Sequence, residues 1–198
     1  MTTISVIKTN HFDRWLRQLK DIRAAGRIQM RLDRLSAGNP GDVRPVGGGI
    51  SELRIDYGPG YRVYYQQKGD VLIVPLHSGD KSSQARTSTG RENSQRRGRT
   101  MTKTEFTEYD SADYLTSVDH IAAYLAAVLE EAGDDTAFVA QALGNVARSQ
   151  NFSELARKVG MSREGLYKAL SADGNPSFAT IMRLTNALGL RIEFHAVA

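Results

Sequence analysis

The chain has 198 residues, of which 40% are hydrophobic and 24% are charged, a composition typical of one large or two small globular domains. It contains no cysteine, which excludes a disulfide scaffold and fits a reducing cytoplasm. No apolar run approaches the roughly 20 residues that a membrane span requires, and no signal peptide is recognisable. The sequence therefore predicts a soluble, cytoplasmic protein with no membrane partner.

Charge is distributed unevenly along the chain. Residues 1 to 100 carry 18 Lys and Arg against 9 Asp and Glu, whereas residues 101 to 198 carry 8 against 13. Within the second half, residues 101 to 135 hold one Lys and nine acidic residues. A basic domain suits a nucleic-acid backbone, and an acidic segment competes for the same surface, although solvated faces have the same composition. We expect two domains of opposite charge, whose charged surfaces either contact each other or both face solvent.

The first 36 residues predict a strand and two helices. The segment from Thr2 to Lys8 is rich in Ile, Val and Thr, as strands are, and Asn10 is the expected cap of the first helix. Apolar residues then recur at helical spacing, at Phe12, Trp15, Leu16, Leu19, Ile22, Ile28, Leu32 and Leu35. The second helix has a basic outer face, formed by Arg23, Arg27, Arg31 and Arg34. The pattern indicates a basic helical hairpin.

From Ile50 the hydrophobic period changes to two. Apolar residues alternate with polar ones in two segments, 50–56 and 61–66, which predicts paired antiparallel strands. The run VLIVPLH, residues 71–77, is typical of a buried strand, in which Pro75 implies an edge or a bulge. Helices covering one face of this small sheet leave the other face to polar residues, namely Arg54, Arg62, Tyr64 and His77.

Several motifs in this half resemble one family of proteins. ELRIDYGPGYRVYY, GNPGD, PVGGGI and HSGDKSSQ, between about Thr2 and Arg86, resemble the RelE-like toxins of the HigB type, the addiction module killers. The resemblance implies a ribosome-dependent endoribonuclease that cuts messenger RNA. By position it implies a phosphate contact from Arg62 and supporting basic roles for Arg54 and Lys81.

The reaction that the resemblance implies needs few groups. A 2′-hydroxyl attacks the neighbouring phosphate, so cations must hold the phosphorane charge and an acid must protonate the leaving oxygen. Strand parity adds Tyr64 and His77 to the candidate catalytic residues. The sequence offers no carboxylate pair and no metal-binding cluster, so we expect neither metal nor cofactor. The bland alternative is that each arginine is a solvated or paired strand residue.

Residues 87 to 100 have the composition of a linker. The segment lacks apolar periodicity and is rich in Arg, Ser, Thr and Gly. Toxins of the family continue here into a last short helix, so this departure puts the activity of the first domain in doubt. The basic residues of the linker either contact nucleic acid or form a solvated tether.

The next 50 residues predict helices that precede a DNA-binding fold. One apolar stripe at helical spacing is expected to pack on the domain core or on a partner, and consists of Leu115, Val118, Ala122, Leu125 and Leu129. Residues from Asp134 and Phe138 onward are expected to open the first helix of the DNA-binding fold.

Residues 151 to 190 have the signals of a helix-turn-helix. Asn151 caps one helix and Gly160 ends it, and Ser162 caps a second helix whose inner side is Leu166, Ala169 and Leu170. The outer residues suit major-groove readout and are Ser162, Arg163, Glu164, Tyr167 and Lys168. A third helix runs from Ser177 to Gly189 with an inner side of Phe178, Ile181, Leu184 and Leu188. The alternative is a packing module without a DNA partner.

The whole of residues 101–198 resembles the HigA-type addiction module antidotes, whose match includes SREGLYKALSADGNPSFATIMRLTNALGL. The prediction is an α+β chain in which a toxin and an antitoxin are fused. Residues 1–86 form a RelE-like antiparallel sheet with two helices, 87–100 a linker, and 101–198 an acidic helical segment and an all-α, lambda-repressor-like domain.

The resemblances imply several partners. These are operator DNA, the ribosome and messenger RNA, and a toxin-antitoxin contact within one chain or swapped between two. A terminal strand from Arg191 to Val197 is expected to pair across a homodimer. The alternative function is a DNA-binding regulator whose toxin part is inactive.

Overall fold

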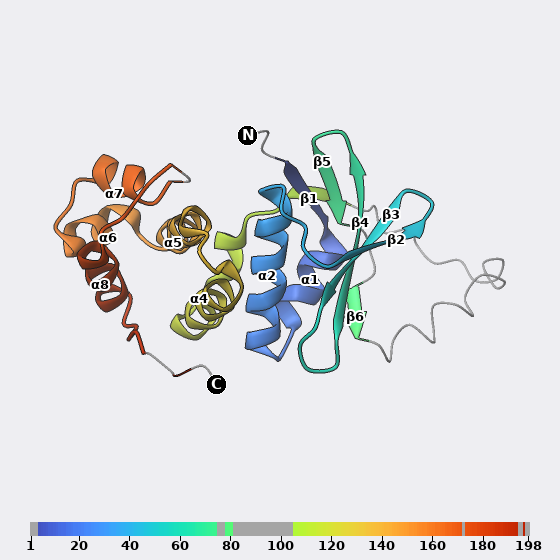
Figure 1. Ribbon diagram of the computed structural model, residues 1–198, viewed down its shortest axis with the longest axis horizontal. Coiled ribbons are helices and arrows are strands. Elements are labelled where there is room, and N and C mark those ends of the chain that lie inside the picture. The colour runs from blue at the N-terminus through green and yellow to red at the C-terminus, as the bar shows by residue number, and fades with distance from the viewer. Residues whose placement is uncertain (1–3, 75–77, 81–104, 172, 194–195, 197–198) are drawn as a thin grey trace. The chain divides into compact units, whose positions relative to one another are not determined.

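The computed structural model describes residues 4–74, 78–80, 105–171, 173–193 and 196. The described chain is mixed α+β, with a sheet followed by a helical region, which confirms the expected class (Figure 1). It divides into two compact units, of which the first comprises residues 1–24 and 31–109 and the second residues 25–30 and 110–198. No described helix has the length and apolar character that crossing a membrane requires.

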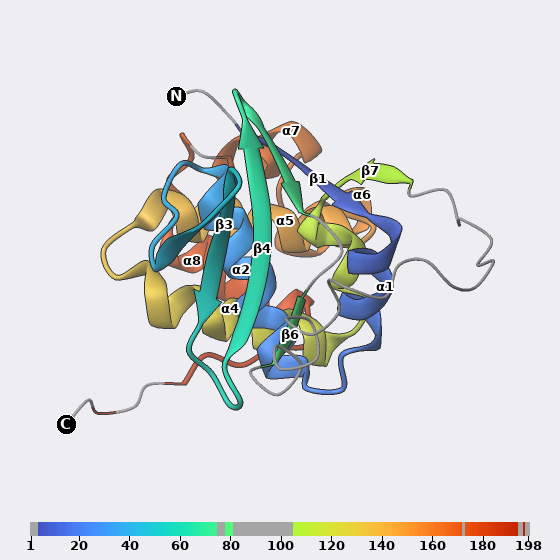
Figure 2. The ribbon, with the colours of Figure 1, turned by 90° about the vertical axis from the view of Figure 1, so that its right-hand side faces the viewer.

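The first unit is built on a seven-stranded sheet with the order β2-β3-β4-β5-β1-β7, and β6 also pairs with β4. The strands are β1 (Ser5–Thr9), β2 (Val43–Gly47), β3 (Ile50–Ile55), β4 (Tyr61–Lys68), β5 (Val71–Val74), β6 (Ser78–Asp80) and β7 (Phe106–Glu108). Figure 2 shows β3 beside β4, which is the longest strand. On its other side, β4 pairs with β5 near its end and with β6 near its start.

The sheet differs from the expected antiparallel one in two respects. β1 pairs in parallel with β5, because the two helices and strands β2 to β4 intervene and form a crossover connection. β2, β6 and β7 were not predicted: Pro45 interrupts the pattern of β2, and only three residues form each of β6 and β7. Pro75 and His77 of the run expected to be one strand lie outside the described residues.

Helices α1 (Asn10–Gln18) and α2 (Ile22–Ser36) lie along one face of the sheet (Figure 1). The cap of α1 is Thr9 rather than the predicted Asn10. Thr9 ends β1 in an extended conformation, and its hydroxyl accepts the Phe12 N–H at 3.2 Å.

The basic outer face predicted for α2 is wrong at Arg31, which is only 7% exposed. The guanidinium of Arg31 donates to the carbonyls of Pro40 and Asp42, at 2.9 and 3.3 Å. These bonds compensate the burial of a charge, and the loop that supplies them could not be foreseen from helical periodicity.

Alternate residues of β3 and β4 belong to the core of the first unit. On one face of the strand pair every apolar side chain is at most 8% exposed, and this set comprises Leu53, Ile55, Tyr61, Val63 and Tyr65. Each such side chain contributes about 1.5–3 kcal/mol through burial. The opposite face of the same strands is therefore the polar face, as period two predicts.

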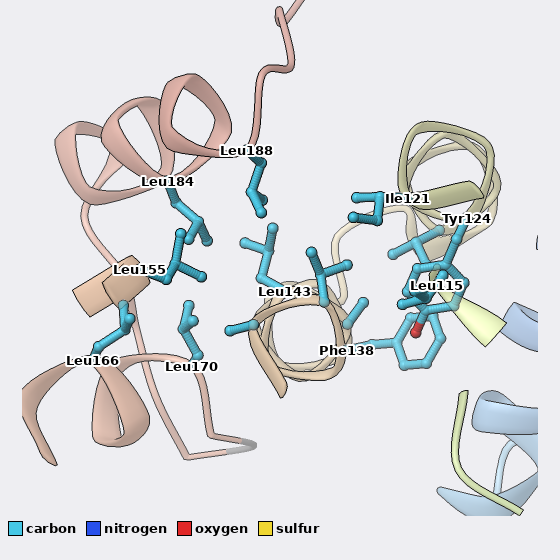
Figure 3. Packing of buried hydrophobic residues seen from close by; sticks show 14 of the residues in the cluster. Leu115, Ile121, Tyr124, Phe138, Leu143, Leu155, Leu166, Leu170, Leu184 and Leu188 are labelled. Atoms are coloured by element: carbon cyan, nitrogen blue, oxygen red, sulfur yellow. The ribbon is translucent and has the colours of Figure 1, made fainter. Parts of the chain in front are cut away.

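The second unit is helical. Its elements are η2 (Ser111–Tyr114), α4 (Val118–Ala132), α5 (Thr136–Ser149), α6 (Phe152–Val159), α7 (Arg163–Ala169) and α8 (Phe178–Ala187). Figure 3 shows Leu143 of α5 between two groups of buried side chains, one from α6 to α8 and one around Tyr124. Inside this core, the Asn145 amide donates to the Tyr124 hydroxyl at 3.1 Å.

The apolar stripe predicted around α4 is buried only in part. Leu115, before the helix, is 1% exposed, and Leu125 is partly buried against the core. Val118 is 49% exposed and Leu129 is 62% exposed, whereas the buried face is formed by Ile121, Tyr124 and Val128. The sequence VDHIAAYLAAVLEEA carries apolar residues on two sides of the helix, so two stripes fit the helical period equally well.

The C-terminal helix and the residues after it also differ from the prediction in part. Phe178 is 63% exposed rather than on the inner side of α8, while Leu184 and Leu188 are buried as expected. Arg191 to Glu193 form no strand, and most of the residues beyond them lie outside the described range.

Candidate nucleic-acid sites

Helices α6 and α7 are joined by a tight turn that begins at Gly160. Gly160 is in the left-handed conformation, with φ 76° and ψ 33°, and its N–H bonds the carbonyls of Ala156 and Arg157. The Met161 N–H bonds the Ala156 carbonyl at 3.0 Å. These bonds satisfy carbonyl groups that the end of a helix leaves without partners, and glycine adopts the required left-handed backbone without strain. The predicted end of α6 is confirmed.

Helix α7 has a buried side and an exposed side. Leu166 and Leu170 are 0% and 4% exposed, which fixes the rotation of the helix on the core. All five residues predicted for DNA contact are exposed, and they are Ser162, Arg163, Glu164, Tyr167 and Lys168. The structure therefore leaves the whole predicted set exposed, on α7 and at its cap.

Two of these residues also have contacts within the protein. The Ser162 hydroxyl accepts the Gly165 N–H at 3.0 Å, so its first role is to cap α7. The Tyr167 ring lies 6.3 Å from the Phe152 ring, measured between centroids, with planes tilted by 57°. Tyr167 is nevertheless 65% exposed, so most of its surface is open to a ligand.

The solvated surface of α6 carries an ion pair. Lys158 contacts the Glu154 carboxylate at 3.0 Å, one turn apart on the helix. The hydrogen bond from Lys158 keeps the pKa of Glu154 below its ordinary value. Both side chains are about half exposed, so the pair adds little to stability.

A second candidate site lies on the polar face of β3 and β4. The strand register places Glu52 opposite Tyr64 and Arg54 opposite Arg62. One oxygen of Glu52 accepts from Arg62 at 2.6 Å and from Tyr64 at 3.1 Å, and the other accepts from Arg54 Nε at 3.1 Å. We call these four residues the Glu52 cluster. It unites three of the five residues predicted for catalysis.

Glu52 makes this arrangement of charges possible. Two arginines directly opposite one another on neighbouring strands repel, and a carboxylate between them offsets the repulsion. Burial raises the pKa of Glu52, but the hydrogen bonds from Arg62, Arg54 and Tyr64 outweigh it and leave the pKa below its ordinary value. The carboxylate is thus ionised at neutral pH, and the cluster retains one net positive charge.

Sequence reasoning overlooked Glu52, although its position contained a signal. It precedes Arg54 by two residues, so both side chains share one face of the strand. The other two predicted catalytic residues, His77 and Lys81, lie outside the described residues. Among the described residues, no group of three or more His, Asp and Glu side chains is placed to bind a metal ion.

On the side away from β5, the edge of β1 pairs with a segment more than 90 residues away in sequence. Ile7, Lys8 and Thr9 lie opposite Glu108, Thr107 and Phe106 in the antiparallel ladder. At its two ends, the Asn10 N–H donates to the Glu105 carbonyl at 3.1 Å and the Tyr109 N–H to the Val6 carbonyl at 2.8 Å. Residues 105–109 therefore belong to the sheet of the first unit.

A family model matches the second half of the chain. Residues 105–196 match the model of a family described as "Probable addiction module antidote protein". A relative from Haemophilus influenzae is 48% identical over 86 residues, which cover 43% of this chain and 87% of the relative. A second one, also from Haemophilus influenzae, is 50% identical over 82 residues, or 41% of this chain and 83% of the relative.

Both relatives are described only as "Uncharacterized protein", and no solved structure matches the chain. The family match covers both β7 and the exposed surface of α7. Residues 105–196 are thus similar to the family of probable addiction module antidote proteins.

Proposed function

We propose that the chain is a fused toxin and antitoxin whose antitoxin part binds operator DNA and represses its own transcription. The observation that carries this proposal is the exposed face of α7, which lies within the antidote-family match and presents Arg163, Lys168 and Tyr167 beside a tight α6–α7 turn. An element of this kind suits the major groove, where arginine and lysine meet base acceptors and phosphates.

In this proposal the helical unit is a lambda-repressor-like helix-turn-helix domain, and α7 is its recognition helix. A homodimer would read a palindromic operator, because paired recognition helices contact half-sites about one DNA turn apart. The match of residues 105–196 to an antidote family supports a toxin as the partner of this region.

The DNA proposal is tested by comparing Arg163→Ala and Lys168→Ala with Arg183→Ala in binding to the promoter of the chain's own gene. Arg183 is an exposed arginine of α8 and serves as the matched control. Loss of a base contact should cost about 1–3 kcal/mol, and loss of a phosphate contact should lower the salt slope by about 1. Unchanged affinity of both α7 variants would contradict the assignment of α7.

A second function is favoured for the first unit by the Glu52 cluster. We propose a RelE-like, HigB-type endoribonuclease that cuts messenger RNA on the ribosome without metal or cofactor. Arg62 and Arg54 would neutralise the charge that develops on the phosphorane, and Tyr64 or His77 would protonate the leaving oxygen. Lys81 would add a further phosphate contact.

The same arrangement is compatible with an inactive toxin part, which leaves the chain as a DNA-binding regulator only. In support of a neutralised toxin, residues 105–109 of the antidote-family region extend the sheet of the first unit. This pairing would be made within one chain or swapped between the two chains of a homodimer. Ribosome-dependent cleavage distinguishes the two functions.

A further inference from the structure

We propose that the outer edge of β1 is a docking site for an extended peptide, and that the chain's own residues 105–109 occupy it as a strand anchor. The anchor keeps the antidote region bound to the first unit even when the chain between residues 81 and 104 is cut. This inference rests on the proposed fusion of toxin and antitoxin, whose regulation it specifies.

The backbone supplies most of the attraction in the strand anchor. Without residues 105–109, β1 would end the sheet with a row of unpaired N–H and C=O groups, which is a template for another strand. Addition of an extended peptide to such an edge gives affinity through main-chain hydrogen bonds. The Tyr109 N–H bonds the Val6 carbonyl and the Asn10 N–H bonds the Glu105 carbonyl. Because hydrogen-bonded pairs alternate along an antiparallel ladder, Lys8 and Thr107, midway between these two pairs, also form a hydrogen-bonded pair.

Side chains make the docking selective. Lys8 is 4% exposed; its ammonium contacts Asp13 at 2.9 Å and lies 5.9 Å from the centre of the Tyr109 ring. Tyr109 is 9% exposed, so its ring is buried beside a lysine that needs compensation for its own burial. Phe106, at the other end of the anchor, is 58% exposed and contributes little. The edge therefore selects an aromatic residue at position 109 but not at position 106.

The anchor is also distinct from the Glu52 cluster. In the sheet order, β5 and β1 separate β7 from β4, which carries Arg62 and Tyr64. The ladder consequently tethers the antidote region without lying beside the candidate catalytic residues. Tethering and inhibition are thus separable properties of the chain.

The test uses the full chain with a specific protease site placed among residues 87–100. After cleavage under native conditions, size-exclusion chromatography with light scattering should show both fragments in one complex of the mass of one chain. Separation of folded fragments would overturn the anchor, and a complex of twice that mass would overturn its assignment to the same chain.

Two pairs of variants of the cut chain test the mechanism. Thr107→Pro removes a ladder donor, whereas Phe106→Pro removes an N–H that points away from β1. Tyr109→Ala removes the buried ring, and Phe106→Ala removes an exposed one. Thr107→Pro and Tyr109→Ala should each weaken association of the fragments about tenfold or more, and both Phe106 variants by less than about threefold.

Equal effects at positions 106 and 107 would overturn strand pairing as the mode of binding. If a variant lowers the folded content seen by circular dichroism, a labelled peptide of residues 103–112 replaces it. The wild-type peptide should displace the cut C-terminal fragment, and its Tyr109→Ala form should not. DNA binding of the cut complex is measured in parallel, so loss of the proposed repressor function is distinguishable from loss of the anchor.

Discussion

At the scale of single residues, Glu52 organises the polar face of the first unit. Its side chain is 5% exposed and contacts two arginines that are 18% and 33% exposed. Removing a buried carboxylate leaves the charges of its partners uncompensated. The stability lost in this way exceeds the stability that the ion pair itself contributes. Removing the charge of the Glu52 carboxylate should therefore destabilise the first unit, even when the replacement side chain keeps the same shape.

We predict that Glu52→Gln destabilises the first unit by about 3 kcal/mol at neutral pH, the lower end for a buried pair, because its arginines keep some access to water. The pKa of Glu52 is lowered in the folded state. Its contribution is therefore fully present above its unfolded pKa of about 4.3 and is lost as pH falls through the folded pKa. The difference between wild type and variant should shrink in acid.

Urea unfolding followed by fluorescence measures this prediction, because the single tryptophan, Trp15, lies in α1 of the first unit. The control is Glu154→Gln, which removes an exposed ion pair and should leave the stability almost unchanged. A destabilisation by Glu52→Gln that stays constant from pH 7 to pH 3 would contradict the role given to the ionised carboxylate.

At the scale of elements, the geometry of α7 depends on how α6 ends. Gly160 turns the chain in the left-handed region, and the next two residues place the cap of α7. Leu166 and Leu170 then hold α7 on the core, so that its polar side faces solvent. A turn of three residues thus determines which side chains are presented to a ligand.

Gly160→Ala is expected to destabilise the second unit by about 1–2 kcal/mol, because a Cβ disfavours the left-handed conformation. Gly160→Asn should cost less, since asparagine tolerates that conformation. Native-state amide hydrogen exchange of α6 and α7 measures both costs. Equal costs for the two variants would show that the backbone conformation is not what requires glycine. Operator affinity should follow the same order.

At the scale of the whole molecule, the chain combines a candidate RNA-cleaving unit with an antidote-family region. The strand anchor predicts that cutting residues 87–100 is insufficient to separate them. The first unit should become free only when the cut chain also carries Thr107→Pro. Residues 87–100 have the composition of a linker where a RelE-like toxin is expected to continue into a helix, which supplies a competing reason for inactivity.

We predict that the intact chain does not cleave ribosome-bound messenger RNA and that the cut Thr107→Pro chain does. Arg62→Ala in that background should abolish cleavage without unfolding the unit, because Arg62 is on the polar face of β4 and leaves no core cavity. Arg54 and Tyr64 still bond the Glu52 carboxylate in this variant, so its charge keeps two partners. Arg23→Ala, an exposed arginine of α2, is the control. A released, folded first unit without activity would support the alternative of a regulator with an inactive toxin part.

Local features of the chain were determined by sequence alone. The caps at Asn151, Ser162 and Ser177, the left-handed Gly160 and the polar side of α7 follow from patterns shorter than two helical turns. The same is true of the alternation in β3 and β4, which assigned Arg54, Arg62 and Tyr64 to one face. In each case the physical cause lies between neighbours in the chain.

Only the tertiary structure decided which elements distant in sequence meet. It selected one of two apolar stripes on α4, placed Glu52 between two arginines on neighbouring strands, and paired Thr107 with Lys8. An edge strand offers the same backbone groups to any extended segment, so β7 has no signature of its own in three residues. The partner is chosen by the burial of Tyr109 beside Lys8, a contact between residues about a hundred positions apart that no local pattern contains.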